Sequence, residues 1–314
     1  MGQLSFISIA QAKKRLRKEK FLNEMDQVIP WKKLAKIVKP CYRDSKIGRN
    51  KMPLERMLRI LCLQQWYGLS DPAVEEEIYD RASFQKFLNL DLLSDPVPDE
   101  TTVLRFRHLL EEHGLFQKIF DEIKKHLETK GFLMKAGTIV DATIVAAPSS
   151  TKNQSGKRDP EMSSTKKGND WYFGMKAHIG VDFQSGLVHT VKATTAKAHD
   201  STRFDDLLHG GEKIVFGDKA YHNEKKKRDF GWRNIHWGIL KKAGPNEVLT
   251  DHQESINRNL SKIRCLVEHP FQVVKCQWNY NKVRYKGISK NFDQQLLLFG
   301  LYNIFKVRKL LLTS

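Results

Sequence analysis

The spacing of apolar residues divides the chain into a helical first part and a mixed second part. Between residues 53 and 130, leucine, isoleucine, methionine and phenylalanine recur every three or four positions, as they do in amphipathic helices. Ser70 or Asp71 can cap a helix at its start, and Gly68 and Gly114 can end one. The pattern therefore predicts four helices in a compact, all-helical region.

After Gly137 the chain changes to short β-branched and apolar runs that are separated by turn-forming residues. Residues 148–170 are rich in Ser, Lys and Gly and are predicted to form a loop, whereas the tail from Gln253 onward is helical again. This order predicts an α/β fold, with a mixed five-stranded sheet flanked by helices. The predicted strands are residues 138–146, 171–182, 187–194, 213–217 and 234–240.

We therefore expect two domains, a helical one at residues 1–132 and a mixed α/β one at residues 133–314. A helical bundle of this size can bind DNA through a helix-turn-helix, or it can serve as a dimerisation module. The sequence leaves both uses open.

The charge of the chain indicates its partner. There are 54 Lys and Arg residues against 36 Asp and Glu residues, which gives a net charge of +18. Such a surplus favours nucleic acid, although a basic protein with a well-solvated surface would have the same composition. The basic run at residues 13–20, KKRLRKEK, is interpreted either as a DNA-contacting arm or as a solvated terminal segment.

Cysteine spacing and hydropathy indicate the cellular compartment of the protein. The four cysteines contain no C-x-x-C pair, so they predict neither a zinc ribbon nor a disulfide framework, and they suit a reducing cytosol. The most apolar stretch, Leu296–Phe305, is shorter than the roughly 20 residues of a membrane span. We expect a soluble intracellular protein with no secretory signal and no membrane partner.

Two aspartates stand where apolar strands are interrupted or end. Asp141 lies inside TIVDATIVA, and Asp218 directly follows KIVFG. An unpaired buried carboxylate is costly, and ligand sites gather at the carboxyl ends of strands. Each residue also has an ordinary interpretation, since Asp141 could be satisfied by backbone donors or an arginine, and Asp218 could cap a helix.

A third acidic residue, Glu268, lies on a predicted helix with Arg264 four residues before it and Lys275 seven residues after it. An exposed Arg–Glu pair of little energetic value would have the same spacing. Pro270 should kink the helix close to Glu268, because proline lacks the backbone N–H that an inner helical turn requires.

Taken together, the three carboxylates can supply oxygen ligands to a pair of Mg²⁺ ions, which favour carboxylates, water and phosphate oxygens. Two such ions stabilise the attacking and leaving oxygens of an in-line phosphoryl displacement. The sequence therefore predicts metal-dependent chemistry on DNA.

Four strings carry a resemblance to a known family: TIVDATIVAAPSS, KRDPEMSSTKKGNDWYFGMKAHIGVD, FGDKAY and RCLVEHPFQVVK. With them the chain resembles the DDE transposases of bacterial insertion sequences, most closely the insertion-sequence-five group, over nearly its whole length. The resemblance implies an RNase H-like catalytic domain. It also implies that Asp141, Asp218 and Glu268 are the catalytic and metal-binding residues, served by two Mg²⁺ ions that Mn²⁺ can replace.

The same resemblance points to candidate DNA contacts. Arg264 and Lys275 fall on the related R-x3-E-x6-K pattern. Lys176 lies in the second of the four strings, near the predicted sheet, and could approach a phosphate. Ser261 stands where wider relatives have tyrosine, so no tyrosine role is expected there. The short segment between Leu240 and Lys262 leaves no room for a large inserted domain.

Aromatic residues alternate with basic ones near the C-terminus. Trp278, Tyr280 and Tyr285 lie among lysines and arginines. They are interpreted either as residues that stack on unpaired bases in a groove of the protein that holds the DNA backbone, or as core residues.

We expect a transposase that binds the ends of its insertion sequence as a homodimer in the bacterial cytoplasm, at the nucleoid, and cuts and joins DNA. A non-catalytic DNA-binding repressor and an RNase H-like nuclease that cleaves without joining are the alternatives. Asp200 and Asp251, outside the triad, are expected to be dispensable.

Overall fold

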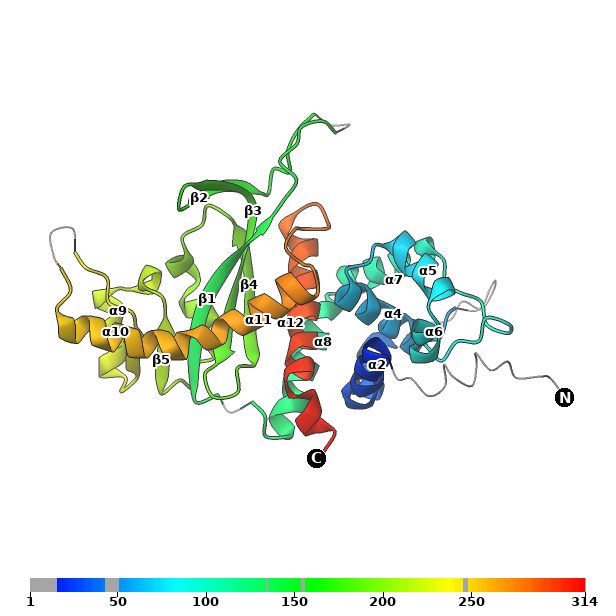
Figure 1. Cartoon of the computed structure of the whole chain (residues 1–314), viewed down its shortest axis with the longest axis horizontal. Coiled ribbons are helices and arrows are strands. Elements are labelled where there is room, and N and C mark those ends of the chain that lie inside the picture. The colour runs from blue at the N-terminus through cyan, green and yellow to red at the C-terminus, as the bar shows by residue number, and fades with distance from the viewer. Residues whose placement is uncertain (1–15, 43–50, 134, 154–155, 245–247, 314) are drawn as a thin grey trace. The chain divides into compact units, whose positions relative to one another are not determined.

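The computed structural model describes residues 16–42, 51–133, 135–153, 156–244 and 248–313. The chain forms two compact units (Figure 1). Unit 1 comprises residues up to Gln65, residues 69–109 and residues 304–314, and unit 2 comprises residues 66–68 and 110–303.

Unit 1 is helical, as the apolar spacing predicts. Its first helix begins at Arg17, so residues 13–15 of the basic run lie outside the described residues. The Ser70 side chain caps the fourth of these helices by accepting from the Ala73 N–H. The helices that begin in this unit are α2 (Arg17–Val28), α3 (Trp31–Val38), α4 (Leu54–Tyr67), α5 (Asp71–Asp80), α6 (Ala82–Phe87) and α7 (Glu100–Glu112).

A buried arginine ties four of these helices together. Arg59 of α4 is 4% exposed and forms ion pairs with Asp26 at 2.7 Å and Glu55 at 2.8 Å. It also donates to the Phe87 carbonyl at 2.8 Å, and its guanidinium lies 4.5 Å from the centre of the Trp31 ring. Because the charge is paired and hydrogen-bonded, its burial is tolerated.

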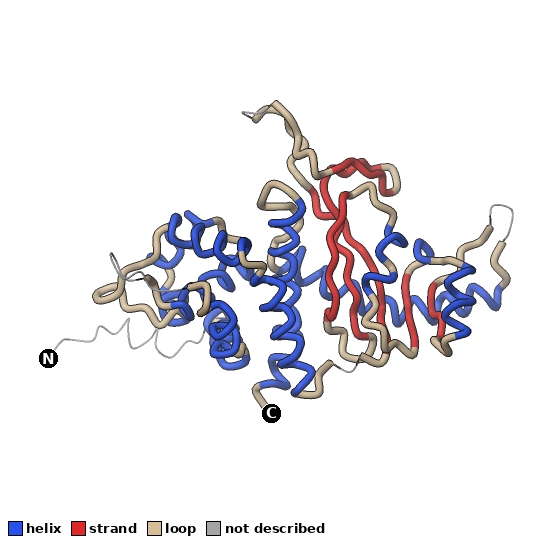
Figure 2. Tube along the Cα trace, turned by 180° about the vertical axis from the view of Figure 1, so that it is seen from behind, coloured by secondary structure: helices blue, strands red, loops and turns tan. Residues whose placement is uncertain are grey.

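Unit 2 contains the sheet and the helices around it (Figures 1 and 2). Its strands are β1 (Gly137–Ala146), β2 (Ser163–Lys167), β3 (Asp170–Asp182), β4 (Val188–Thr195), β5 (Ile214–Gly217) and β6 (His236–Ile239). Its helices are α8 (Leu115–Thr129), α9 (Glu224–Trp232), α10 (Asp251–Arg264), α11 (Glu268–Gln272) and α12 (Ile288–Leu311), the last of which continues into unit 1.

The sheet is mixed. β3 pairs antiparallel with β1, β2 and β4, whereas β5 pairs parallel with both β1 and β6. The order β2-β3-β1-β5-β6, with β4 on β3, confirms the predicted hairpin order followed by crossovers. This is the α/β architecture of an RNase H-like domain, with helices outside the sheet.

The prediction of five strands was wrong by one. Residues 163–167 form β2 within the stretch that was expected to be a loop, and Lys167 pairs with Asp170 across the two-residue turn Gly168-Asn169. Gly168 has φ 62°, which suits the first position of such a hairpin turn. The Gly-Asn pair was the available signal, but the polar composition of the flanking residues outweighed it.

Helices cover both ends of the sheet. α12 is anchored to β4 through the Asn303 side chain, which accepts from the Val188 N–H and donates to the Val188 carbonyl, each at 2.7 Å. α8 is anchored there through Lys124, which donates to the His189 carbonyl at 3.0 Å. At the other end, α9 buries Phe230 against Phe204 and Val215.

The expected helical tail is broken. The Thr250 side chain caps α10, the helix tightens into a 3₁₀ turn at Cys265–Val267, and α11 is followed by a π-helical turn at Val273–Gln277. Residues 278–287 then cross to β1, where Val283 donates to the Ala146 carbonyl at 2.8 Å. Among the described helices, none is long and apolar enough to cross a membrane.

Gly174 is the point at which β3 passes from its pairing with β1 to the end of β2. A Cβ atom there would clash with the Val145 carbonyl oxygen and lie 3.0 Å from the Ala147 nitrogen. Because both are backbone atoms, we expect Gly174→Ala to lower the free energy of unfolding by about 1–3 kcal/mol in urea denaturation. Gly231→Ala in α9 is the matched control, since nothing lies within 4 Å of its Cβ position. Equal losses in both variants would contradict the steric explanation.

Candidate active site

Asp141 and Asp218 come together because β1 and β5 are parallel neighbours. The last residues that pair between the two strands are Val140 and Gly217. Asp141 directly follows Val140, and Asp218 directly follows Gly217. The negative charge of Asp218 contributes to raising the pKa of Asp141. Two aspartates that are remote in sequence thus share one edge of the sheet.

Asp141 is held in a partly buried place, with 19% of its side chain exposed. Burial between the strands raises the pKa of its carboxyl to about 6. Two contacts oppose this rise: the Ala142 N–H donates to Oδ1 at 2.8 Å, and Arg264 lies 3.3 Å from Oδ2. The site therefore holds a carboxylate whose charge is only partly compensated by the protein.

Glu268 is linked to this pair through Arg264. One guanidinium nitrogen of Arg264 contacts Asp141, and another lies 2.8 Å from Oε1 of Glu268. The Glu268 side chain is 57% exposed, so it reaches the site from the surface. Pro270 explains the local geometry, because it cannot donate to residue 266 and the chain adopts a 3₁₀ turn at Cys265–Val267 just before Glu268.

Lys275 braces β1 from the π-helical turn that follows. Its ammonium donates to Thr143 Oγ1 at 3.1 Å and to the Ile144 carbonyl at 2.9 Å. Burial, and next the positive charge of Lys167, lower its pKa. Lys275 therefore carries its charge on the edge of β1 beyond Asp141.

Lys176 is occupied by a different partner. It lies 2.9 Å from Oδ1 of Asp200 and donates to the Ala198 carbonyl at 2.7 Å, and only 12% of its side chain is exposed. Its role at a DNA phosphate stays a prediction, since contact with DNA would require the lysine to leave Asp200.

Two residues that the sequence reasoning missed also belong to this neighbourhood. The negative charge of Asp200 contributes to raising the pKa of Asp141, so Asp200 is a poor choice of dispensable control. Burial raises the pKa of Tyr221, followed by the charges of Asp141, Asp200 and Asp218. The sequence signal that could have pointed to Tyr221 is its closeness to Asp218, because Tyr221 ends the short helical turn that begins directly after Asp218.

Two of the three aromatic residues near the C-terminus are core residues. Trp278 is 4% and Tyr280 is 1% exposed, so neither can stack on a base. Trp278 closes the π-helical turn by donating to the Val273 carbonyl at 3.0 Å. Tyr285 is half-buried.

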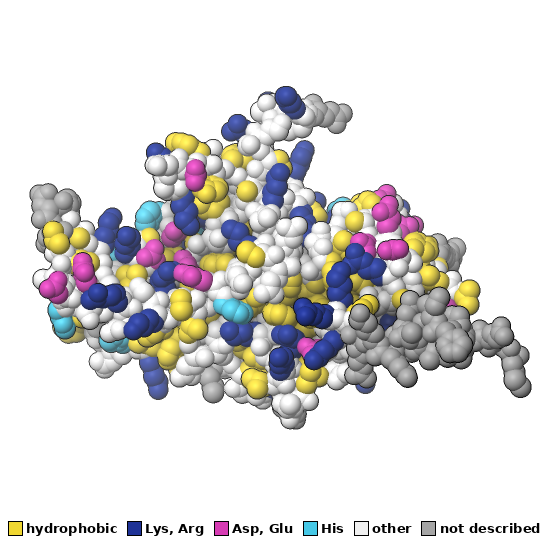
Figure 3. Space-filling view, in the orientation of Figure 1, with side chains coloured by type: hydrophobic (Ala, Val, Ile, Leu, Met, Phe, Trp, Pro, Cys, Tyr) yellow, Lys and Arg dark blue, Asp and Glu magenta, His cyan; other side chains and the backbone are white. Residues whose placement is uncertain are grey.

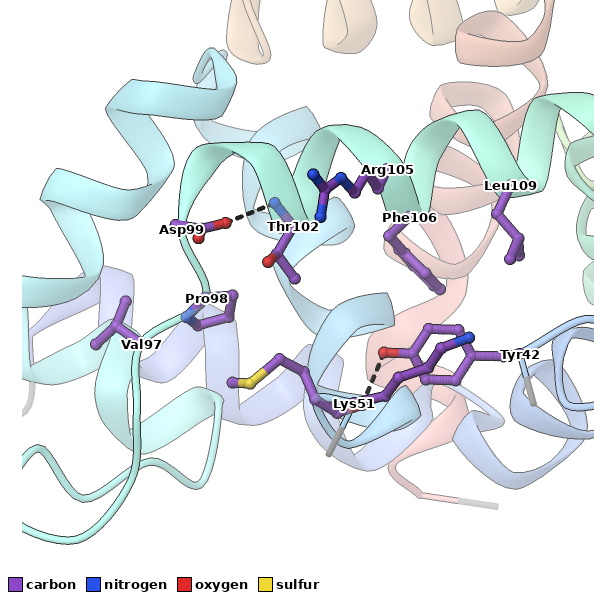
Figure 4. A pocket seen from close by; sticks show the side chains of 10 residues that line it. Tyr42, Lys51, Val97, Pro98, Asp99, Thr102, Arg105, Phe106 and Leu109 are labelled. Carbon is purple, nitrogen blue, oxygen red and sulfur yellow. Dashed lines mark hydrogen bonds between the residues drawn. The ribbon is translucent and has the colours of Figure 1, made fainter. Parts of the chain in front are cut away.

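Unit 1 has a cavity of about 380 Å³, seen in Figure 4, but it lacks the chemistry of the triad. Its one carboxylate, Asp99, caps α7 by accepting from the Thr102 N–H at 2.6 Å, and hydrogen bonds from Thr102 lower its pKa. The Tyr42 hydroxyl at the same cavity donates to the Met52 carbonyl at 2.8 Å. The candidate site is therefore in unit 2, where Asp141, Asp218 and Glu268 form the set that we call the carboxylate group.

The donors of that group suit a hard divalent cation. Asp141, Asp218 and Glu268 offer carboxylate oxygens, the ligands that Mg²⁺ prefers, and the guanidinium of Arg264 supplies positive charge between two of them. In the described ranges, no three His, Cys, Asp or Glu side chains are already close enough together to hold a metal ion.

The raised pKa of Asp141 makes stability depend on pH. Its folded value of about 6 exceeds the ordinary 3.8, so the folded protein keeps a proton that the unfolded chain has lost, and stability falls as pH rises between these values. The loss is up to about 3 kcal/mol, because one pKa unit corresponds to about 1.4 kcal/mol. In EDTA, we expect Asp141→Asn to raise the free energy of unfolding at pH 7.5 by about 1–3 kcal/mol and to change it little at pH 4. Urea denaturation at both pH values measures this, and an equal gain at both would show that packing, not charge, is responsible.

Known families match both parts of the chain. A family model described as "Transposase DDE domain" matches residues 133–304, and one described as "Transposase domain (DUF772)" matches residues 10–109. These matches confirm the resemblance at the level of insertion-sequence DDE transposases and do not single out the insertion-sequence-five group. The first covers more than half of the chain and includes every residue of the carboxylate group. The chain therefore belongs to the transposase DDE domain family.

Proposed function

We propose that this chain binds the ends of its insertion sequence, cleaves DNA there and joins the freed 3′ ends to target DNA, as a member of the insertion-sequence-five group. The observation that carries the proposal is the gathering of carboxylates from distant segments. Asp141, inside β1, and Asp218, at the end of β5, directly follow the last paired residues of these two strands, and Glu268 is joined to Asp141 through Arg264.

Asp141, Asp218 and Glu268 are the residues that would hold two Mg²⁺ ions, or Mn²⁺ in their place. Bound ions of this kind stabilise the attacking and leaving oxygens of a phosphoryl displacement. Asp141 is ionised above its pKa of about 6, so a neutral solution supplies the negative charge that attracts a cation. Family membership supports divalent-metal chemistry in general terms.

The basic residues of the site have distinct tasks in this proposal. Arg264 offsets the repulsion between Asp141 and Glu268, and its guanidinium is placed to pair with a phosphate when cations occupy the carboxylates. Lys275 is fixed on β1 by two hydrogen bonds and presents positive charge beside the same edge. Both therefore position DNA backbone relative to Asp141.

Unit 1 is the proposed reader of the insertion-sequence ends, because it is a separate helical unit without any of the three carboxylates. Two such chains acting as a homodimer would hold two ends together at the nucleoid. A truncation after residue 130 is a poor test, since α8 lies in unit 2 and carries the Lys124 contact to β4.

The catalytic proposal is tested by charge removal. Asp141→Asn, Asp218→Asn and Glu268→Gln keep the side-chain shape but remove the charge that attracts metal. Each should slow DNA nicking and joining by about 10³-fold or more in Mg²⁺, because bound metal supplies several kcal/mol of transition-state stabilisation. A double variant should be little worse than a single one, since the residues act as a unit. Strand cleavage and strand transfer on DNA that carries the flanking element ends are the measurements.

Asp251→Asn is the matched control, because Asp251 is exposed in the first turn of α10 and lies outside the carboxylate group. It should retain most activity, and all variants should still bind DNA. Substantial cleavage by any of the three variants would remove that residue from the site. Full activity in EDTA would contradict the metal proposal as a whole.

A salt titration tests how DNA is held. The net charge of +18 predicts that phosphate contacts dominate affinity. The logarithm of the binding constant for duplex DNA should then fall linearly with the logarithm of salt concentration, by about 0.9 for each phosphate neutralised. Fluorescence anisotropy between low and physiological salt measures the slope, and a flat response would contradict the electrostatic proposal.

A further inference from the structure

The hairpin formed by β2 and the start of β3 exposes aromatic surface that the fold itself does not use. Trp171 is 71% exposed and Tyr172 is 37% exposed. Both lie close to the turn at Gly168-Asn169, and Trp171 pairs with Lys166 across the hairpin. Figure 3 shows hydrophobic side chains at the surface over β2, with Lys or Arg side chains beside them. Adjacent exposed apolar side chains with polar residues beside them are typical of an interaction site.

The same hairpin carries positive charge. Lys166 and Lys167 are exposed, and neither has an ion-pair partner or a side-chain hydrogen bond among the described residues. Asp170, the one acid at the tip, pairs with Lys167 only through the backbone register. Exposed aromatic rings beside unpaired lysines are the combination that holds single-stranded nucleic acid, because rings stack on bases and ammonium groups contact phosphates.

The hairpin is also directed toward the catalytic edge. Figures 1 and 2 show it bending away from the line of β3, to the side of β3 on which β5 lies. The charge of Lys167 acts on Lys275, which is bound to Thr143 and Ile144 on β1. By alternation along β3, Trp171 also lies on the same face of the strand as Ile179, the register partner of Asp141.

We propose that the β2–β3 hairpin binds the single strand of DNA that lies beside the cleavage site, with a base stacked on Trp171 and phosphates held by Lys166 and Lys167. This rests on the proposed function for the identity of the strand, but binding can be measured without catalysis. Trp171 is thus a binding residue for unpaired DNA, and duplex DNA does not need it.

The test uses the full chain in EDTA with two fluorescent probes, a 20-nucleotide oligothymidylate and a 20-base-pair duplex of mixed sequence. Trp171→Ala should weaken oligothymidylate binding by roughly 5- to 100-fold, the range for loss of one base–aromatic stack, and leave duplex binding within about 3-fold. Trp171→Phe should retain most of the affinity, because the ring remains. The double variant Lys166→Ala, Lys167→Ala should reduce the salt slope for the oligothymidylate by about 1.4, since each phosphate contact on a single strand contributes about 0.7.

Trp232→Ala is the matched control, because Trp232 is 88% exposed at the end of α9, outside the hairpin. It should change neither affinity by more than about 2-fold, the size of effect expected when no stack is lost. Unchanged oligothymidylate binding by Trp171→Ala would overturn the inference, as would an equal loss in the Trp232→Ala variant. A change in oligomeric state by light scattering, without loss of binding, would instead assign Trp171 to a contact between copies of the chain.

The proposal and the proposed function can fail separately. Metal-dependent cleavage by the wild-type chain tests the function, whereas the two probes in EDTA test the hairpin alone. Loss of oligothymidylate binding in Trp171→Ala would support the hairpin's role even in a chain that does not cleave.

Discussion

Parallel pairing of β1 with β5 is the contact on which the candidate active site depends. Four residue pairs, from Gly137 with Ile214 to Val140 with Gly217, fix the register. Because β5 stops at Gly217, its pairing with β1 ends at Val140, and Asp141 and Asp218 directly follow the last paired residues of the two strands. A shift of one residue would send one carboxylate to the opposite face of the sheet, since side chains alternate along a strand.

Arg264 supplies the electrostatic balance that this pairing requires. Burial disfavours the charge on Asp141, and the charge of Asp218 on the neighbouring strand adds repulsion. A single guanidinium that contacts both Asp141 and Glu268 offsets part of this cost and draws a surface glutamate toward the sheet. The interrupted helix around Pro270 contributes to the same site, because its 3₁₀ and π-helical turns set the positions of Glu268 beside Arg264 and of Lys275 on β1.

Five positive charges of unit 2 illustrate two different situations. Arg264, Lys275 and Lys176 are engaged with the protein, by a carboxylate, a strand edge and an acidic loop residue. Lys166 and Lys167 stand on the hairpin without such engagement. The first group shapes the site and sets the charge around Asp141, whereas the second is free to respond to a polyanion. Net charge alone cannot make this distinction, since it counts every lysine equally.

The sequence by itself determined the helical first part, the mixed sheet and most strand positions, because apolar periodicity and breaks in apolar runs are local properties. The helices α4, α5, α7 and α8 and five of the six strands follow from it, and the long motif strings identified the family that the matched models support. Glu268 could be singled out through its spacing from Arg264, but the bridge from Arg264 to Asp141 joins segments whose distance no local pattern encodes.

Only the tertiary structure decided that Trp278 and Tyr280 are core residues while Trp171 is exposed, since burial depends on which elements pack together. It likewise decided that the charge of Asp200 acts on Asp141 and that Lys176 is already paired, because both depend on how the residues after β4 fold back against β3.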